Sequence, residues 1–404
     1  MSQSELYHVL NLHGYRVNRL ERADKVLMLH IEPQPHRLAC SQCGSRDVIR
    51  RGQKERWFRH LPIGSACIWL IASLPRVECQ SCGLVRQISL GFAEPRYTYT
   101  RAFERYALEL CQRMTIQDVA DYLGIGWDTI KDIQKRYLQK HYSKPSLKGV
   151  RRIGIDEISV GHGHRYLTIV LDWDSGAILF AGEGKKAESL DLFWRRVRAG
   201  RTRIRAVAMD MSAAYQLAVH ENLPEAAIVF DRFHVIKLYN EKLTALRRQL
   251  HREATSQQER KVLKGTRWLL LKNPENLDPL KGEPRRLRQA LELNEPLAMA
   301  YYLKDDLKQF WEQPDKSAAR RKLFDWYHQA TESGIEILKA FADTLLYHKH
   351  GILAWYDHPI SNGPLEGTNN KIKTMNRQHY GLRDQEFFRL KLYQLHETKY
   401  ALVG

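Results

Sequence analysis

The chain has 404 residues, 43% of them hydrophobic and 10% aromatic, so it can bury a sizeable core and is not a disordered chain. Its length suits about two to three domains. Lys and Arg total 64 against 46 Asp and Glu, and the net charge of +18 indicates a polyanionic partner, either nucleic acid or an anionic membrane. No apolar run approaches the ~18 residues that span a membrane, and MSQSELYHVL lacks a signal layout. We therefore expect an intracellular protein with reduced cysteines and no membrane partner.

Four of the six cysteines form two C-x-x-C steps: Cys40 with Cys43, and Cys79 with Cys82. In a reducing compartment, paired steps of this kind are typical of four thiolate ligands around one structural zinc. A hairpin inserted between the steps would account for their wide spacing. One step could instead be a chance spacing, and His36 or His60 could replace a cysteine ligand.

Basic side chains crowd this N-terminal module, which we assign to residues 1–95. Four of them are candidates for contact with DNA phosphates: Arg46, Arg50, Arg51 and Lys54. The alternative is a zinc site that only holds the fold together and does not touch DNA.

The segment 115–133, within an expected domain over 96–147, has the pattern of a helix-turn-helix. Val119, Ala120 and Leu123 lie on one helix face, Gly124 permits a turn, and apolar residues then repeat at helical spacing. Three residues of the second helix are candidates for DNA contact: Thr129, Lys131 and Lys135. An ordinary helical hairpin is the alternative.

From residue 151 onward the pattern changes to alternating strands and helices. Strands are expected over 153–160, 165–173, 177–181, 204–210 and 227–231, with helices over 187–198 and 213–222. Three strands joined by hairpins and followed by alternating helices and strands give the order of an RNase H-like α/β fold. That order alone does not establish an activity.

Three acidic residues lie at positions where a solvent-exposed surface charge is not expected. Asp156 lies in the middle of an apolar strand, and Asp210 ends another. A buried carboxylate costs several kcal/mol unless it has a partner, and divalent cations are natural partners for oxygen ligands. Glu366 lies near a helix start, and Asn370 and Lys373 share its helix face. A carboxylate, an amide and a cation on one helix face fit a site in which the carboxylate binds a metal ion and the other two groups contact phosphate.

Five segments together resemble the DDE transposases of the ISL-three insertion-sequence group. They are the four-cysteine module and residues 154–158, 209–215, 231–235 and 360–373. The resemblance covers nearly the whole chain and implies that Asp156, Asp210 and Glu366 form the catalytic carboxylate triad. Asp231 and His234 resemble an Asp-x-x-His signature that follows the second catalytic Asp in several transposase superfamilies. His234 could equally be a hydrogen-bonded core residue.

The resemblance also implies a helical insertion between Asp210 and Glu366. Residues 240–340 show no strand pattern, and basic helices are expected over 241–252, 258–271, 285–293 and 304–311. Arg247 and Arg248 are candidates for DNA contact, unless this charge series is simply a solvated face. Three tryptophans are expected in the core: Trp268, Trp311 and Trp326.

The expected fold class is therefore multidomain α+β. It begins with a zinc-binding module and a helix-turn-helix, and an RNase H-like α/β catalytic domain follows, interrupted by an all-helical insertion. We assign residues 148–239 to the first part of the catalytic domain, 240–345 to the insertion and 346–404 to the second part.

The resemblance implies a DNA transposase that binds the terminal inverted repeats of its insertion sequence and catalyses metal-dependent strand cleavage and strand transfer. Two magnesium ions, with manganese as a substitute, would bind the three carboxylates, because all three offer oxygen. Residues expected to support the site or to contact the DNA backbone near it are Asp231, His234, Asn362, Asn369, Asn370, Lys371 and Lys373.

The expected partners are double-stranded DNA, as terminal repeats and as target, and further copies of the chain. Because two DNA ends must meet, a homodimer or larger assembly is expected. The expected location is the bacterial cytoplasm, at the nucleoid. Two other functions stay open: a zinc-finger and helix-turn-helix transcription regulator, and an RNase H-like nuclease that cuts without strand transfer.

Overall fold

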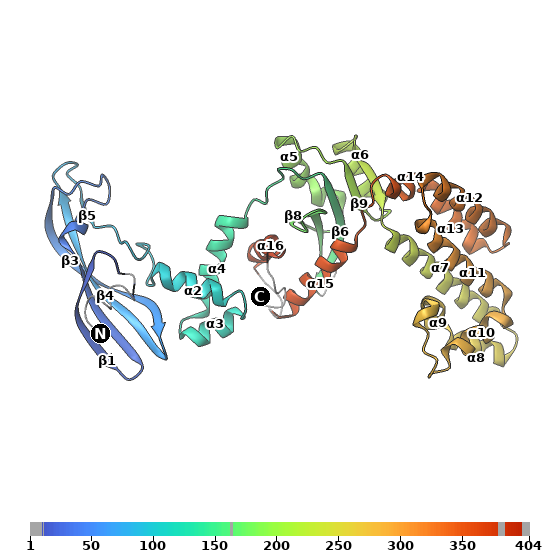
Figure 1. Cartoon of the computed structure of the whole chain (residues 1–404), viewed down its shortest axis with the longest axis horizontal. Helices are drawn as coiled ribbons and strands as arrows, with labels where there is room; N and C mark the ends of the chain where they lie inside the picture. The colour runs from blue at the N-terminus through green and yellow to red at the C-terminus, as the bar shows by residue number, and fades with distance from the viewer. Residues whose placement is uncertain (1–9, 11, 162–164, 379–383, 398–404) are drawn as a thin grey trace. The chain divides into compact units, whose positions relative to one another are not determined.

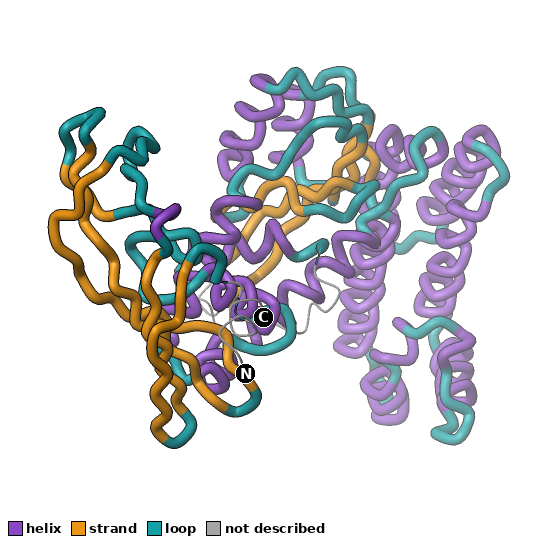
Figure 2. The backbone as a smooth tube through the Cα atoms, turned by 60° about the vertical axis from the view of Figure 1, so that its left-hand side comes forward, coloured by secondary structure: helices purple, strands orange, loops and turns teal. Residues whose placement is uncertain are grey.

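A computed structural model describes residues 10, 12–161, 165–378 and 384–397 of the protein. The chain divides into two compact units, one running to Lys140 and the other beginning at His141. Figures 1 and 2 show the elements of both units, with the strands of each gathered in a sheet.

The first unit is built on a five-stranded sheet. Its strands are β1 (Tyr15–Ala23), β2 (Val26–Pro33), β3 (Val48–Ile63), β4 (Ala66–Cys79) and β5 (Val85–Gln87), in the order β1-β2-β4-β3 with β5 also paired to β4. β3 and β4 form a long antiparallel hairpin. Leu29, Phe58 and Leu70 pack in the core against one face of this sheet. The hairpin lies between the two C-x-x-C steps, as the sequence predicted.

Three helices complete the first unit: α2 (Arg101–Leu110), α3 (Ile116–Leu123) and α4 (Trp127–Tyr142), with the short η1 (Pro35–Arg37) among the strands. Thr115 and Asp118 form a capping box at the start of α3. Gly124 ends α3 with a φ of 59°, a left-handed conformation that glycine adopts without a Cβ clash. The helix–turn–helix geometry predicted from the apolar spacing is confirmed.

The second unit contains a five-stranded mixed sheet. Its strands are β6 (Arg152–Gly161), β7 (Arg165–Asp172), β8 (Ile178–Glu183), β9 (Ala206–Met209) and β10 (Ala227–Phe230). The spatial order is β10-β9-β6-β7-β8, with β6, β7 and β8 antiparallel and with β9 and β10 parallel to β6. All five strands fall within the ranges predicted from the sequence or within two residues of them.

Helices cover both faces of this sheet. η2 (Ala187–Leu190), α5 (Asp191–Ala199) and α6 (Ala213–Asn222) pack on the face that carries Ile153 and Ile155. α15 (Gly363–Gln378) and α16 (Gln385–Gln394) pack on the opposite face, where Leu365 meets Ile158 in one apolar cluster. Successive strand residues point to opposite faces, so Gly154 and Asp156 face α15.

Between β10 and α15 the chain is helical. The elements are α7 (Arg232–Glu253), α8 (Gln257–Gly265), α9 (Arg267–Leu271), η3 (Pro274–Asn276), α10 (Glu283–Leu293), α11 (Glu295–Lys308), η4 (Gln309–Glu312), α12 (Lys316–Glu332), α13 (Glu336–Tyr347), α14 (Lys349–Leu353) and η5 (Ala354–Tyr356). Trp311 and Trp326 are buried as predicted. Trp268 is not: it is 65% exposed, because the five-residue helix α9 turns it outward with Arg267 beside its ring.

Candidate active site and zinc site

A cavity of about 670 Å³ opens in the second unit where β6, the first turns of α7 and the first turns of α15 meet. Its lining includes six of the residues predicted from the sequence: Asp156, Asp231, His234, Asn362, Glu366 and Asn370. Four cations also line it: Arg232, Lys237, Lys308 and Lys373. Carboxylates, amides and positively charged side chains therefore line the same cavity. This combination suits a site that binds a phosphate group.

Asp156 is held by two hydrogen bonds at the floor of this cavity. The backbone N–H of Glu157 donates to Oδ1 over 2.8 Å, and Asn369 Nδ2 donates to Oδ2 over 2.8 Å. Burial raises the pKa of Asp156 above its usual range, and the nearby charge of Asp210 adds to that rise. A cation in the cavity would offset this cost of ionisation.

Glu366 projects into the same cavity from the first turn of α15, whereas Asp210 lies just outside its lining. Asp210 directly follows β9, and its Oδ1 accepts a 3.0 Å hydrogen bond from the backbone N–H of Ser212. Its charge still acts on the cavity, because it raises the pKa of Asp156 and of Glu157. Among the described residues, these carboxylates are not drawn into one tight ligand cluster.

Asp231 ties the start of α7 to the segment before α15. Its side chain is 3% exposed; Oδ1 accepts a 3.0 Å hydrogen bond from the backbone N–H of Asn362, and Oδ2 lies 3.1 Å from His234 Nδ1. This hydrogen bond raises the pKa of His234, against the opposing effect of burial. The Asp-x-x-His pair therefore positions one imidazole and one backbone segment at the cavity wall.

Asn362 has a buried side chain with no hydrogen-bond partner among the described residues. It is 4% exposed, and both Oδ1 and Nδ2 are unpaired although they border the cavity. Leaving a buried polar group unpaired costs about 1–3 kcal/mol. An amide that is held this way is suited to a ligand that enters the cavity.

The four predicted zinc ligands converge in the first unit. The Sγ atoms of Cys40, Cys43, Cys79 and Cys82 all lie within 4.8 Å of one another. Cys40 and Cys82 sulfurs are 3.7 Å apart and those of Cys43 and Cys79 are 3.4 Å apart. Zinc–sulfur bonds of ~2.3 Å in a tetrahedron give sulfur–sulfur edges of ~3.8 Å, so the set fits one zinc ion.

His60 is not a substitute ligand. It is 2% exposed, its Nδ1 lies 2.9 Å from Thr100 Oγ1, and burial lowers its pKa to about 4. This histidine is a neutral core residue of the first unit.

Comparison with known proteins identifies the family. A transposase family model matches residues 153–392, a model of the helix-turn-helix domain of transposase family ISL3 matches 88–138, and a zinc-finger model of the transposases of IS204, IS1001, IS1096 and IS1165 matches 36–82. The transposase for insertion sequence element IS1001 of Bordetella parapertussis is 34% identical over 385 residues, which cover 94% of each chain. The chain belongs to the ISL3 family of transposases. Its function is DNA transposition.

Two more distant likenesses accompany these matches. The transposase for insertion sequence element IS1557 of Mycobacterium tuberculosis is 28% identical over 372 residues, covering 86% of this chain and 83% of the relative. The solved Drosophila P element transposase strand transfer complex aligns with a TM-score of 0.33 and 12% identity, over 66% of this chain and 81% of that one. The second likeness is too weak to support a conclusion. Among the described helices of the transposase, none is long and apolar enough to cross a membrane.

The family matches bear out two predictions directly. The zinc-finger match spans all four cysteines, which supports a structural zinc in the transposase. The helix-turn-helix match spans the pattern at 115–133, so the alternative of an ordinary helical hairpin is wrong. The zinc finger, the helix-turn-helix and the transposase domain follow one another in the predicted order.

Some cavity residues of the transposase have other roles than the sequence indicated, or were not predicted from it. Asn369 was expected to contact the DNA backbone, whereas its Nδ2 donates to Asp156; Asn370 was the amide chosen from helical spacing. Asn273 and Lys308 come from the helical region, and Lys308 Nζ donates to Asn273 Oδ1 over 2.6 Å at the cavity wall. No pattern in the sequence links these two residues to a carboxylate site, because only tertiary packing brings them there.

Most basic residues predicted to contact DNA are accessible in the transposase. Arg46, Arg50, Arg51, Lys54 and Arg248 are exposed, and Thr129, Lys131 and Lys135 are half-buried. Arg247 is different, since it is 8% exposed and its Nη1 donates to Leu263 O over 3.0 Å. Arg247 therefore packs α7 against α8, and its assignment to DNA contact is corrected.

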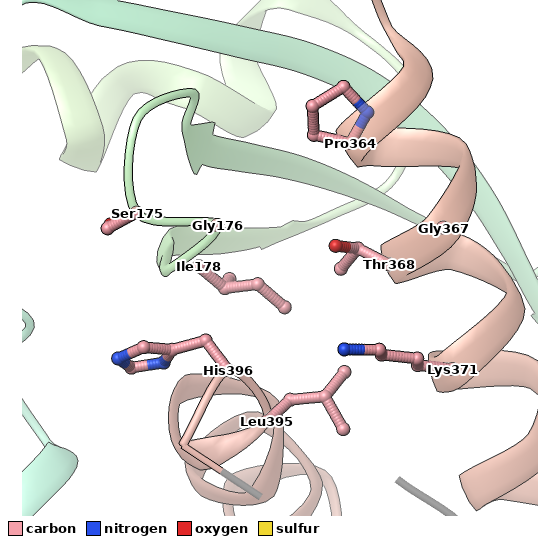
Figure 3. A pocket seen from close by; sticks show the side chains of 9 residues that line it. All are labelled: Ser175, Gly176, Ile178, Pro364, Gly367, Thr368, Lys371, Leu395 and His396. Carbon is pink, nitrogen blue, oxygen red and sulfur yellow. The ribbon is translucent and has the colours of Figure 1, made fainter. Parts of the chain in front are cut away.

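Lys371 and Lys373 lie on different sides of α15. Lys373 lines the carboxylate cavity, whereas Lys371 lines a second cavity of about 210 Å³ between α15, the β7–β8 turn and the end of α16. Figure 3 shows Thr368 and Lys371 pointing into this second space, with His396 across from them. The two lysines therefore cannot serve the same stretch of the carboxylate cavity.

Proposed function

We propose that this transposase cuts DNA at the terminal inverted repeats of its insertion sequence and joins the freed 3′ ends to target DNA, using Asp156, Asp210 and Glu366 in an RNase H-like domain. One observation carries the proposal. Asp156 in the sheet and Glu366 on α15, which are far apart in the sequence, line a single cavity together with four cations. The strand order β10-β9-β6-β7-β8 supports an RNase H-like assignment for residues 148–239 and 346–404, with 240–345 inserted between them.

The donor set of the cavity fits magnesium, with manganese as a substitute. Asp156, Asp210 and Glu366 offer carboxylate oxygens, which hard divalent cations prefer, and the unpaired amide of Asn362 offers one more oxygen nearby. Burial, with a smaller contribution from Asp210, raises the pKa of Asp156, and a bound divalent cation would favour its ionised form. When bound, two such ions activate the attacking oxygen and stabilise the leaving oxygen of an in-line displacement at a phosphate.

The chain's own residues position the reacting groups. Asn369 fixes the orientation of Asp156, and Asp231 holds both His234 and the backbone of Asn362. His234, whose pKa is raised by its hydrogen bond to Asp231, places an imidazole at the wall where a phosphate oxygen would lie. Asn370 and Lys373 offer further contacts to the DNA backbone from α15.

The first unit recognises the terminal repeats in this proposal. The helix-turn-helix contributes Thr129, Lys131 and Lys135. The zinc module contributes exposed basic residues, with Arg46 just before β3 and Arg50, Arg51 and Lys54 on it. Because two transposon ends must be joined in one reaction, we expect a homodimer or a larger assembly acting on chromosomal DNA.

A cleavage assay on duplexes that carry the element's terminal repeats tests the proposal. With magnesium present, Asp156→Ala should abolish cutting while DNA binding stays nearly unchanged, and Asp191→Ala, an exposed carboxylate of α5, serves as the matched control. If Asp156→Ala cut DNA like the unmodified chain, the triad would be wrong. Nicks without joined products would favour a nuclease, and binding without any cutting would favour a transcription regulator.

A further inference from the structure

Phe233 stands out in the carboxylate cavity because, apart from it, Ile236 and Gly363, the described residues that line the cavity have charged or polar side chains. It is the second residue of α7, it is 56% exposed, and it lines the cavity beside Arg232 and His234. Its ring meets the His234 ring edge-on, with centroids 5.8 Å apart. One ring edge is therefore fixed against His234, and more than half of the side chain is left open.

The size of the cavity exceeds what a phosphate group needs. Its volume of about 670 Å³ lies within the ~300–1,000 Å³ of pockets that bury a drug-sized organic ligand. Its rim carries Lys237, on the same helix as Phe233, and Lys373 on α15. Cations that follow a backbone, combined with an aromatic platform on which a base stacks, are the features of single-strand nucleic-acid binding.

We infer that Phe233 stacks against an unpaired nucleobase next to the scissile phosphate, so that the strand being cut leaves the duplex at that point. The inference rests on the proposed function, because it assumes that the strand is cut in this cavity. Extruding a base exposes the adjoining phosphate, and the enzyme offsets the lost base stacking with an aromatic ring. Phe233 is a positioning residue here, since the ring contacts the base and no reacting atom.

The expected effect of Phe233→Ala is a loss of about 5- to 150-fold in the cleavage rate, which corresponds to the ~1–3 kcal/mol that a stacked base contributes. Phe233→Trp should cut nearly as fast as the unmodified chain, because it keeps an aromatic face. Tyr347→Ala is the matched control, since Tyr347 is 81% exposed and is not among the residues that line the cavity. Melting temperatures of all variants should agree within a few degrees.

The decisive measurement combines the full-length protein with modified DNA. Duplexes carrying the terminal repeat receive an abasic site at each nucleotide flanking the cut in turn. At one position, removing the base should erase the difference between Phe233→Ala and the unmodified chain. At that position 2-aminopurine should brighten on binding, and Phe233→Ala should change that signal while Tyr347→Ala does not.

The outcomes separate this inference from the proposed function. If the unmodified chain never cuts terminal-repeat DNA, the proposed function fails. If it cuts, but Phe233→Ala cuts equally fast and no abasic position alters the comparison, only the role of Phe233 is overturned. A rate loss that every abasic substrate retains would also overturn it, because the ring would then act on the protein and not on a base.

Discussion

Gly154 lets α15 approach β6 closely, and its replacement by alanine should move Glu366 away from Asp156. Gly154 lies two residues before Asp156 on β6, and Leu365 directly precedes Glu366 on α15. A Cβ built on Gly154 would lie 2.5 Å from Leu365 Cδ1 and 3.2 Å from Leu365 Cγ. Carbon atoms pack at about 3.5–4.0 Å, so the helix or the side chain must move by about 1 Å. Leu365 is 1% exposed within its apolar cluster and has little room to turn away.

The expected cost is about 1–3 kcal/mol of unfolding free energy, as for other overpacked cores. A displacement of about 1 Å at a catalytic group reduces a rate by about 100-fold, so cleavage should suffer more than stability does. Urea unfolding and the terminal-repeat cleavage assay measure the two effects. Gly367→Ala, also on α15, is the control: its Cβ would meet nothing within 4 Å, and alanine favours a helix by about 1 kcal/mol.

A double substitution decides whether the contact with Leu365 is the cause. Gly154→Ala combined with Leu365→Ala should restore part of the cleavage rate, with a coupling energy of about 0.5–3 kcal/mol. If Gly154→Ala unfolds and cuts like the unmodified chain, or if Leu365→Ala rescues nothing, the reasoning about this close approach is refuted.

Three further predictions follow from the site geometry. Magnesium at 100 times its Kd should stabilise the folded protein by about 2.7 kcal/mol. The magnesium-induced rise in Tm should grow with pH, because ionised Asp156 is costly without a cation once the pH exceeds its raised pKa. Asp156→Ala should lose this effect. Protonated His234 stabilises the fold below its usual pKa of about 6.5, and that contribution disappears as pH rises through the raised value, so Asp231→Asn should flatten this part of the stability–pH curve measured by urea unfolding. Metal analysis should find one zinc per chain, and Cys79→Ser should remove it and lower the Tm of the first unit, whereas Cys111→Ala should retain the metal.

Local signals explain what the sequence could predict. The five strands of the second unit contain short apolar runs, and the buried face of α3 repeats at helical spacing with a capping residue before it and glycine after it. Asp156 was detectable because an acidic residue interrupts an apolar strand. The four cysteines were detectable because thiolate ligands must occur in closely spaced pairs to close a metal knuckle.

Residues whose role depends on a neighbouring element could not be assigned in the same way. Arg247 and Arg248 are adjacent and equally basic, and only the packing of α8 on one side of α7 buries the first and exposes the second. Helical spacing from Glu366 indicated Asn370, yet Asn369 is the residue that reaches Asp156, because α15 crosses β6 at an angle that periodicity does not define. Lys308 reaches the cavity only through the folding of the helical region.

The two faces of α15 show why a single motif carries so much of the site. Leu365, Ile372 and Met375 bury one stripe of the helix against the sheet, which fixes its rotation. That rotation sends Glu366, Asn369 and Lys373 toward the carboxylate cavity and Lys371 toward the second cavity. Apolar packing therefore determines which polar residues can act together. The geometry of the proposed catalytic site thus depends on the core beneath α15 as much as on the acidic residues themselves.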